Sequence, residues 1–129
     1  MLQNEVQKIV RQFRVTSRYK GYLLIIDATI LYLEKDFIQI TKDIYPVLAQ
    51  KYHMSTTSIE RNIRTIIEIC WRNDRRAVQN LFGYELTKCP TNSEFIEAIA
   101  YFIANKKTCV FLYIFFVFQN INQNIIMTL

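Results

Sequence analysis

Glycine and proline are scarce in this chain, and their scarcity limits the folds that it can adopt more than any other feature. The 129 residues include two glycines and two prolines. A β-sandwich or barrel needs a tight turn after each short strand, and such turns draw heavily on these two residue types. We therefore expect an all-α protein with long helices. The length predicts a single domain, since domains usually have ~100–200 residues.

Composition and charge narrow the class of partner. Hydrophobic residues make up 51% of the chain, which is enough for a packed core. The formal net charge is +5, which suits a polyanion such as nucleic acid or an acidic membrane face. The most apolar helical segment, residues 19–33, is interrupted by Asp27 and is shorter than the ~20 residues that span a bilayer. We therefore do not expect a membrane partner.

The cysteines and the single histidine give little sign of catalytic or metal chemistry. Cys70, Cys89 and Cys109 form an odd set without a CxxC pair, so we expect free thiols in a reducing cytoplasm. His53 stands alone, whereas a zinc site needs ligands in close pairs. Cys89 without an evident base is more often inert than nucleophilic. No phosphate-binding loop or nucleophile motif occurs, so we expect no metal, no cofactor and no enzyme activity.

The spacing of apolar and capping residues predicts six helices. Ser55 and Thr57 are both N-cap candidates for the fourth helix, and Thr57 with Glu60 has the spacing of a capping box. Thr91 and Glu94 repeat that spacing at the sixth helix. The helices are predicted over residues 2–14, 19–33 and 42–52, from near residue 56, from a cap at Asn73 or Asp74 to a stop at Gly83, and from Thr91 onward. The predicted inward residues include Val47, Leu48 and Tyr52 of the third helix and Phe102 of the sixth.

The fourth predicted helix has two contrasting faces. Its apolar stripe consists of Ile59, Ile63, Ile66, Ile67 and Cys70, and its opposite stripe consists of Glu60, Arg61, Arg64, Thr65 and Glu68. The arginine fork matches guanine O6 and N7, and a glutamate accepts from cytosine N4. With the helix over residues 42–52, this pattern predicts a helix-turn-helix whose second helix enters the major groove of DNA. On spacing alone, a surface ion pair between Glu60 and Arg64 explains the same residues better.

Several short motifs follow one another in the order and spacing of a known family. They are KGY at 20–22, IYP at 44–46, IERNIR at 59–64 with EICW at 68–71, LFGY at 81–84 and PTNSEF at 90–95. On these motifs, residues 5–103 resemble the C-terminal DNA-binding effector domain of the stage-zero sporulation response regulator, a sporulation initiation transcription factor family. The resemblance implies a six-helix domain over residues 1–107, a response-regulator effector of the winged-helix-like superfamily that contains a helix-turn-helix.

The resemblance also implies a set of DNA contacts at A/T-rich promoter boxes with a G·C-containing core. The base-reading residues of the family fall on Glu60, Arg61 and Arg64. Ser58 and Thr65 stand where the family usually has Arg and His, so two backbone contacts are weakened. The implied phosphate contacts are Ser55, Thr57, Ser58, Thr65, Lys106 and Lys107.

The two ends of the sequence depart from the family. A receiver domain with a phosphoacceptor Asp normally precedes this module, and we expect this chain to lack one. Residues 108–129 form an uncharged tail with an apolar run at 109–118. The tail could extend the last helix, form a strand, bind a partner or promote aggregation. The chain is then a stand-alone paralogue, a phage- or plasmid-borne copy, or a gene remnant with an unrelated tail.

The sequence therefore predicts a cytoplasmic, nucleoid-associated regulator that recognises double-stranded DNA and controls sporulation-type genes. RNA polymerase and a homodimer on tandem sites are further partners that this interpretation allows. The alternative is a protein-interaction module that has kept the fold but lost DNA reading.

Overall fold

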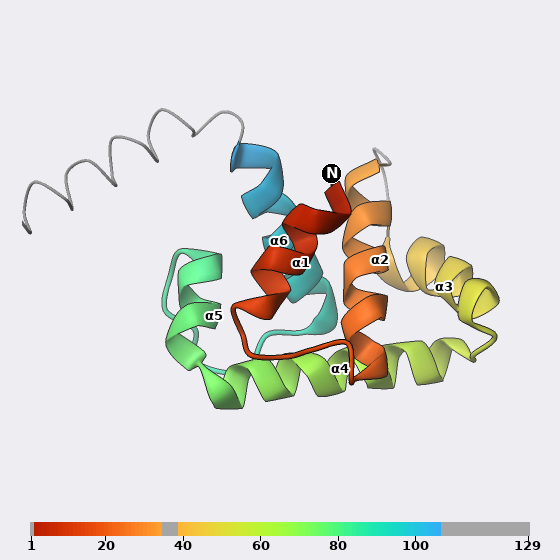
Figure 1. The fold of residues 1–129 in the computed structure, drawn as a ribbon, viewed down its shortest axis with the longest axis horizontal. Helices are drawn as coiled ribbons and strands as arrows, with labels where there is room; N and C mark the ends of the chain where they lie inside the picture. The colour runs from red at the N-terminus through yellow and green to blue at the C-terminus, as the bar shows by residue number, and fades with distance from the viewer. Residues whose placement is uncertain (1, 35–38, 107–129) are drawn as a thin grey trace, which may run out of the picture.

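A computed structural model of the chain describes residues 2–34 and 39–106 (Figure 1). These residues form six α-helices and no strand, which confirms the predicted fold class. The expectations for Lys107 and for residues 108–129 lie outside the described residues. The helices are α1 (Leu2–Arg11), α2 (Lys20–Glu34), α3 (Tyr45–Tyr52), α4 (Thr56–Asn73), α5 (Arg75–Phe82) and α6 (Asn92–Lys106), and a short π-helix η1 (Ile40–Ile44) leads into α3.

Helix α2 lies at the centre of the fold, as its apolar composition predicts. It contacts α1, α3, α4 and α6, and Figure 1 shows α1 and α3 on opposite sides of it. Leu24, Ile25, Ile26 and Ala28 are at most 1% exposed. The one buried polar side chain of this helix, Thr29, donates its hydroxyl to the carbonyl of Ile25 at 2.8 Å. A helix enclosed on several sides satisfies its polar groups internally, because water does not reach them.

The first turn of α2 lies directly against α4, and Gly21 makes this approach possible. A Cβ atom at Gly21 would overlap the backbone carbonyl of Asn62 and the side chain of Ile66, both on α4. Because glycine has no Cβ, the backbones of α2 and α4 can approach each other more closely than they could with any other residue at position 21. The KGY motif is therefore a site of close helix packing.

A polar link joins α2 to α3. The carboxylate of Asp27 forms an ion pair with Lys51 at 2.9 Å and accepts a hydrogen bond from the Tyr52 hydroxyl. Burial and the hydrogen bond to Asp27 together raise the pKa of Tyr52 to about 12, so the phenol is neutral at physiological pH. Asp27, which interrupts an otherwise apolar helix in the sequence, therefore fixes the position of α3.

Two predicted inward side chains are exposed, which corrects the sequence interpretation. Val47 is 41% exposed, whereas Leu48 beside it is fully buried. Pro46 lies in the first turn of α3, so this helix begins at Tyr45 and has only two turns with which to cover the core. Phe102 is 45% exposed because it lies at the rim of a hollow between α1 and α5, beside Ile9 and Leu81.

We predict that Gly21→Ala destabilises the domain. At an unhindered helix position this change stabilises a protein by ~1 kcal/mol, because alanine has the higher helix propensity. Here the new methyl group meets the Asn62 carbonyl, and such overpacking costs about 1–3 kcal/mol. Urea denaturation of both proteins measures the difference. An alanine variant as stable as the parent would show that α2 and α4 are not in close contact at this residue.

Candidate DNA-binding surface

Helices α3 and α4 are joined by a short turn and form a helix-turn-helix. Helix α3 ends at Tyr52, and the next residue, His53, caps it with left-handed backbone angles (φ 53°, ψ 46°). The N–H groups of His53 and Met54 both donate to the carbonyl of Ala49, which satisfies the end of the helix. The only histidine of the chain thus lies in the turn between the two helices.

Ser55 caps the N-terminus of α4. It has an extended backbone (φ −75°, ψ 155°), and its Oγ accepts from the N–H of Ser58 at 3.1 Å. The same hydroxyl donates to the Oγ of Ser58 at 3.0 Å. The predicted capping box of Thr57 and Glu60 is wrong, because Thr57 already lies inside the first turn and the cap precedes it. Ser55, the other candidate, is the N-cap.

The two faces of α4 are divided as the sequence predicts. All five residues of the apolar stripe are at most 1% exposed. On the opposite side Glu60, Arg61, Thr65 and Glu68 are exposed and Arg64 is half-buried. Figure 1 shows α4 running along one side of the molecule, with α3 near one end and α5 at the other. The polar face of α4 is therefore open to a large partner.

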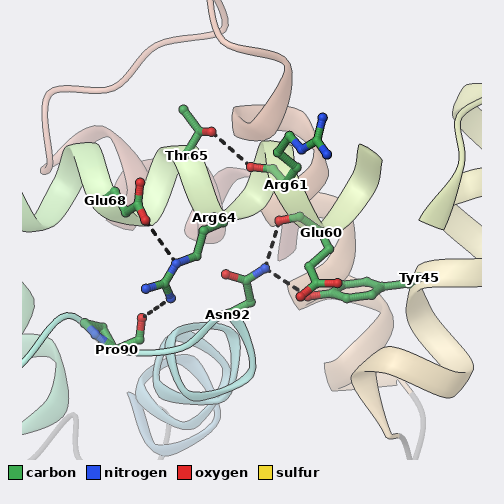
Figure 2. A network of polar contacts seen from close by, with 8 residues as sticks. All are labelled: Tyr45, Glu60, Arg61, Arg64, Thr65, Glu68, Pro90 and Asn92. Atoms are coloured by element: carbon green, nitrogen blue, oxygen red, sulfur yellow. Dashed lines mark hydrogen bonds and ion pairs between the residues drawn. The ribbon is translucent and has the colours of Figure 1, made fainter. Parts of the chain in front are cut away.

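Arg64 is held by two contacts, neither of them with Glu60. Its Nε donates to Glu68 Oε1 at 3.2 Å, and its Nη1 donates to the backbone carbonyl of Pro90 at 3.1 Å (Figure 2). The ion pair between Glu60 and Arg64 that spacing favours is absent from the described structure, so that interpretation is wrong. The physical reason is the buried Pro90 carbonyl, which needs a donor and draws the guanidinium away from Glu60.

Arg61 has neither an ion pair nor a side-chain hydrogen bond to the part of the chain that the structure describes. Figure 2 shows its guanidinium pointing away from the group formed by Arg64 and Pro90. Its backbone carbonyl accepts the hydroxyl of Thr65 at 3.0 Å, which uses the only proton of that hydroxyl. Arg61 is therefore the arginine of the predicted trio with all five N–H donors open to a ligand.

Asn92 joins the first turn of α6 to the helix-turn-helix, and sequence analysis did not identify it. Its Nδ2 donates to the Tyr45 hydroxyl at 3.2 Å and to the Glu60 carbonyl at 3.0 Å. The residue is 8% exposed, and its Oδ1 has no hydrogen-bond donor among the residues that the structure describes. Burial raises the pKa of Tyr45, the hydrogen bond with Asn92 partly opposes that rise and the Glu60 charge adds to it, so this phenol stays neutral. The PTNSEF motif, which contains Asn92, is the one sequence signal that could have pointed to this contact.

Asn92, Tyr45 and Glu60 lie around a small hollow beside the N-terminal half of α4. Its volume is about 280 Å³. Thr91, on its rim, caps α6 by accepting from the N–H of Glu94 at 3.2 Å, and its hydroxyl donates to the Glu94 carboxylate at 2.9 Å. Thr91 is therefore confirmed as the N-cap of α6, and Glu94 reaches back to the Thr91 hydroxyl rather than to its backbone N–H as a full capping box requires. The lining consists of Thr41, Tyr45, Glu60, Arg64, Thr91, Asn92 and Ser93.

The thiol groups are poorly suited to nucleophilic chemistry. Burial raises the pKa of Cys89, so its thiolate is scarce at neutral pH. Burial also raises the pKa of Cys70, to about 12. Within residues 2–34 and 39–106, no three His, Cys, Asp or Glu side chains gather in a way that could hold a metal ion. In the same ranges no helix has the length and apolar character needed to cross a membrane.

The fold and the open face of α4 define a helix-turn-helix domain of the DNA-binding type. Residues 6–103 match the family described as sporulation initiation factor Spo0A, C terminal. The match covers most of the chain, and the protein belongs to this family, as the short motifs predict. The family comprises DNA-binding domains of a sporulation transcription factor and is not a family of enzymes.

The predicted phosphate contacts are distributed over three places. Ser55, Thr57 and Ser58 lie at the start of α4, and Thr65 lies two turns further along its exposed side. Lys106 is the last residue of α6, remote in sequence from the others.

We predict that Ser55→Ala lowers the free energy of unfolding by about 1 kcal/mol, because the Ser58 N–H loses its acceptor. Thr57→Ala is the matched control, since Thr57 is exposed and caps nothing, and it should change stability by less than ~0.5 kcal/mol. Thermal melting of the three proteins gives both values. A larger loss of stability for Thr57→Ala than for Ser55→Ala would show that Ser55 is not the N-cap.

Proposed function

We propose that this chain is a sequence-specific DNA-binding regulator of sporulation-type genes and that the N-terminal half of α4 reads bases in the major groove. The observation that carries the proposal is the contrast between the two faces of α4. One face is fully buried, and the other presents Arg61 with no partner among the described residues. An exposed, unpaired arginine in the first two turns of the second helix is well placed for base readout in a helix-turn-helix.

The three base-reading candidates have different roles in this proposal. Arg61 donates two parallel hydrogen bonds to guanine O6 and N7. Glu60 accepts from a cytosine amino group on the neighbouring base pair. Arg64 retains three N–H donors after its contacts with Glu68 and Pro90, and these contacts hold its fork in one orientation. A guanidinium that is already oriented loses less side-chain entropy when it binds.

The phosphate contacts position α4 in the groove. Thr57 lies in the first turn of α4, where the helix dipole and the unpaired N–H groups favour an anion. Ser55 already donates its hydroxyl proton to Ser58, so it can donate to a phosphate only by rearranging, whereas the hydroxyl proton of Ser58 is still available for a phosphate. Thr65 must turn its hydroxyl away from the Arg61 carbonyl. Lys106, the last residue of α6, and Lys107, which follows it in the sequence, complete the proposed set.

A protein-interaction module is the second candidate function, and one group of exposed side chains favours it. Tyr84 is 61% exposed, Tyr101 is 73% exposed and Phe102 is 45% exposed, all at the α5–α6 side of the domain. Exposed aromatic residues often anchor protein interfaces. RNA polymerase or a second copy on tandem DNA sites are the partners that such a surface would serve. Salt dependence separates the two functions, since counterion release lowers log affinity for DNA by ~0.9 per phosphate contact with each log unit of salt.

The decisive test compares Arg61→Ala and Arg64→Ala on a duplex that the parent protein selects from a randomised pool, with a scrambled duplex as reference. Each variant should lose ~1–3 kcal/mol of binding to the selected duplex and little to the scrambled one. Arg64→Ala should also lose about 1 kcal/mol of folding stability, because the buried Pro90 carbonyl loses its donor. Arg61→Ala should melt like the parent.

Fluorescence anisotropy gives the affinities, and Arg11→Ala on α1 serves as the control for loss of one positive charge. If a variant keeps the parent's ratio of affinities for the selected and scrambled duplexes, the arginine that it lacks does not read bases. Failure of the parent itself to prefer any duplex would favour the interaction module.

Ser58→Arg and Thr65→His test the two proposed phosphate contacts at which this chain lacks the basic residue that the family usually has. Both changes should raise affinity for the selected and scrambled duplexes equally, since phosphate contacts carry no sequence information. The salt slope should steepen by up to about one unit for Arg and by less for a partly charged His. Anisotropy titrations at several salt concentrations measure this slope. An unchanged slope in both variants would mean that these positions do not approach the DNA backbone.

A further inference from the structure

Two arginines at the far end of α4 have no role in the base-reading site. Arg72 lies in the last turn of α4, and Arg75 opens α5. Both side chains are exposed, and neither forms an ion pair with the described residues. The guanidinium of Arg75 lies over the ring of Trp71, 4.4 Å from its centroid. We call Arg72 and Arg75 the distal arginine pair.

Local helix stability accounts for Arg72, because the helix dipole favours a cation in the last turn of α4, but it does not account for Arg75. The first turn of α5 contains no acidic residue, and it begins with Arg75 and Arg76. Positive charge at a helix N-terminus is unfavourable because the helix dipole is positive there. The carboxylate of Asp74, which directly precedes these two arginines, caps α5 by accepting from the N–H of Ala77 at 3.0 Å. The two arginines that open α5 therefore cost the isolated domain some stability, and a partner of opposite charge would offset that cost.

The distal arginine pair continues the exposed face of α4. Arg72 follows Arg61 by three turns and lies within ~20° of it around the helix axis, because successive residues are ~100° apart. Burial raises the pKa of Cys89, and Arg64, Glu68 and Arg75 are all close enough to affect it: the two arginines oppose the rise and Glu68 adds to it. The exposed arginines thus extend from the first half of α4 to the start of α5, and Figure 1 shows α4 along one side of the molecule, with α3 near one end and α5 at the other.

The separation of Arg61 and Arg72 limits what the distal arginine pair can touch. The rise of the helix places their Cα atoms about 16 Å apart. The major groove is ~12 Å wide, so an arginine this far from the base-reading residues reaches the edge of the groove or beyond it. Phosphates line that edge, and an arginine fork binds a phosphate with two parallel hydrogen bonds.

Protein is a poorer match for this surface than DNA. The large exposed hydrophobic side chains of the described residues are Tyr19, Leu23, Val47, Tyr84, Tyr101 and Phe102, and none of them lies on α4 or in the first turn of α5. A specific protein interface usually has an apolar or aromatic centre and a charged rim. A polyanion needs only the charges and is the partner that this surface fits.

We propose that Arg72 and Arg75 bind backbone phosphates of the DNA next to the segment that α4 reads, so that the interface extends along the whole of α4 to α5. This proposal deepens the proposed function and rests on it. The pair adds affinity for any duplex and leaves the choice of sequence to the first half of α4.

The experiment compares two double variants. The distal double variant carries both Arg72→Gln and Arg75→Gln, and the α1 variant carries both Lys8→Gln and Arg11→Gln, on the exposed side of α1. Both double variants lose the same charge. Anisotropy titrations of the full chain over a series of salt concentrations use the selected and scrambled duplexes, each extended by one helical turn at both ends. Thermal melting checks that each variant folds.

The distal double variant should reduce the salt slope by up to about two units, since each phosphate contact contributes ~0.9. Its affinity should fall by the same factor for both duplexes, and the α1 variant should keep the parent's slope. Arg72→Gln alone leaves Arg75 over Trp71 and should lower the slope by about one unit. Two results would overturn the proposal in a parent protein that clearly prefers the selected duplex. In the first, the distal double variant keeps the parent's salt slope. In the second, the α1 variant loses as much of the slope as the distal double variant. If the parent binds no DNA, the proposed function fails first.

Discussion

The close contact between α2 and α4 is the constraint on which the rest of the structure depends. Helix α2 is apolar on nearly all sides, and other helices must enclose it to keep it from water. Gly21 allows α4 to cover one end of α2 at a distance that no side chain would permit. Because this contact fixes the rotation of α4, it also decides which residues of α4 remain outside. The exposed position of Arg61 therefore follows from the packing of Ile66 against α2.

Two polar links then set the helix-turn-helix relative to this core. Asp27 of α2 binds Lys51 and Tyr52 at the end of α3, and Asn92 of α6 binds Tyr45 of α3 and the backbone of Glu60. The bonds of Asp27 involve a charged carboxylate and those of Asn92 join neutral groups, and both kinds are directional. Apolar packing alone would let the short helix α3 slide or rotate. These links restrict α3 and α4 to one mutual arrangement.

The exposed face of α4 divides into regions with different electrostatics. Near the start of the helix, the charge of Arg64 is balanced by Glu68, while Arg61 is unbalanced. At the far end, Arg72 and Arg75 have no ion-pair partner among the described residues. An intramolecular ion pair on a surface contributes little to stability, but it fixes the direction of a long side chain. Arg64 is thus held in place for a directional contact, and the unpaired arginines remain free to respond to a phosphate or a base edge.

Much of this protein could be predicted from sequence, wherever the controlling contacts are local. The six helices, the caps at Asp74 and Thr91, the stop at Gly83 and the two faces of α4 all depend on residues within about four positions of each other. Periodicity and capping chemistry describe such contacts well. The sequence also contained the family motifs, and with them the candidate DNA-binding residues.

Tertiary structure decided what depends on partners far apart in the chain. Arg64 binds the carbonyl of Pro90, 26 residues away, rather than Glu60, four residues away, because a buried carbonyl needs a donor. Asn92 reaches Glu60 across 32 residues. The choice of Ser55 over Thr57 as the cap depends on where the turn after α3 ends, and the exposure of Val47 and Phe102 depends on how much neighbouring helices cover. A periodic pattern shows which face of a helix is apolar, but only the packed fold determines how far that face is covered and which polar group lies opposite each side chain.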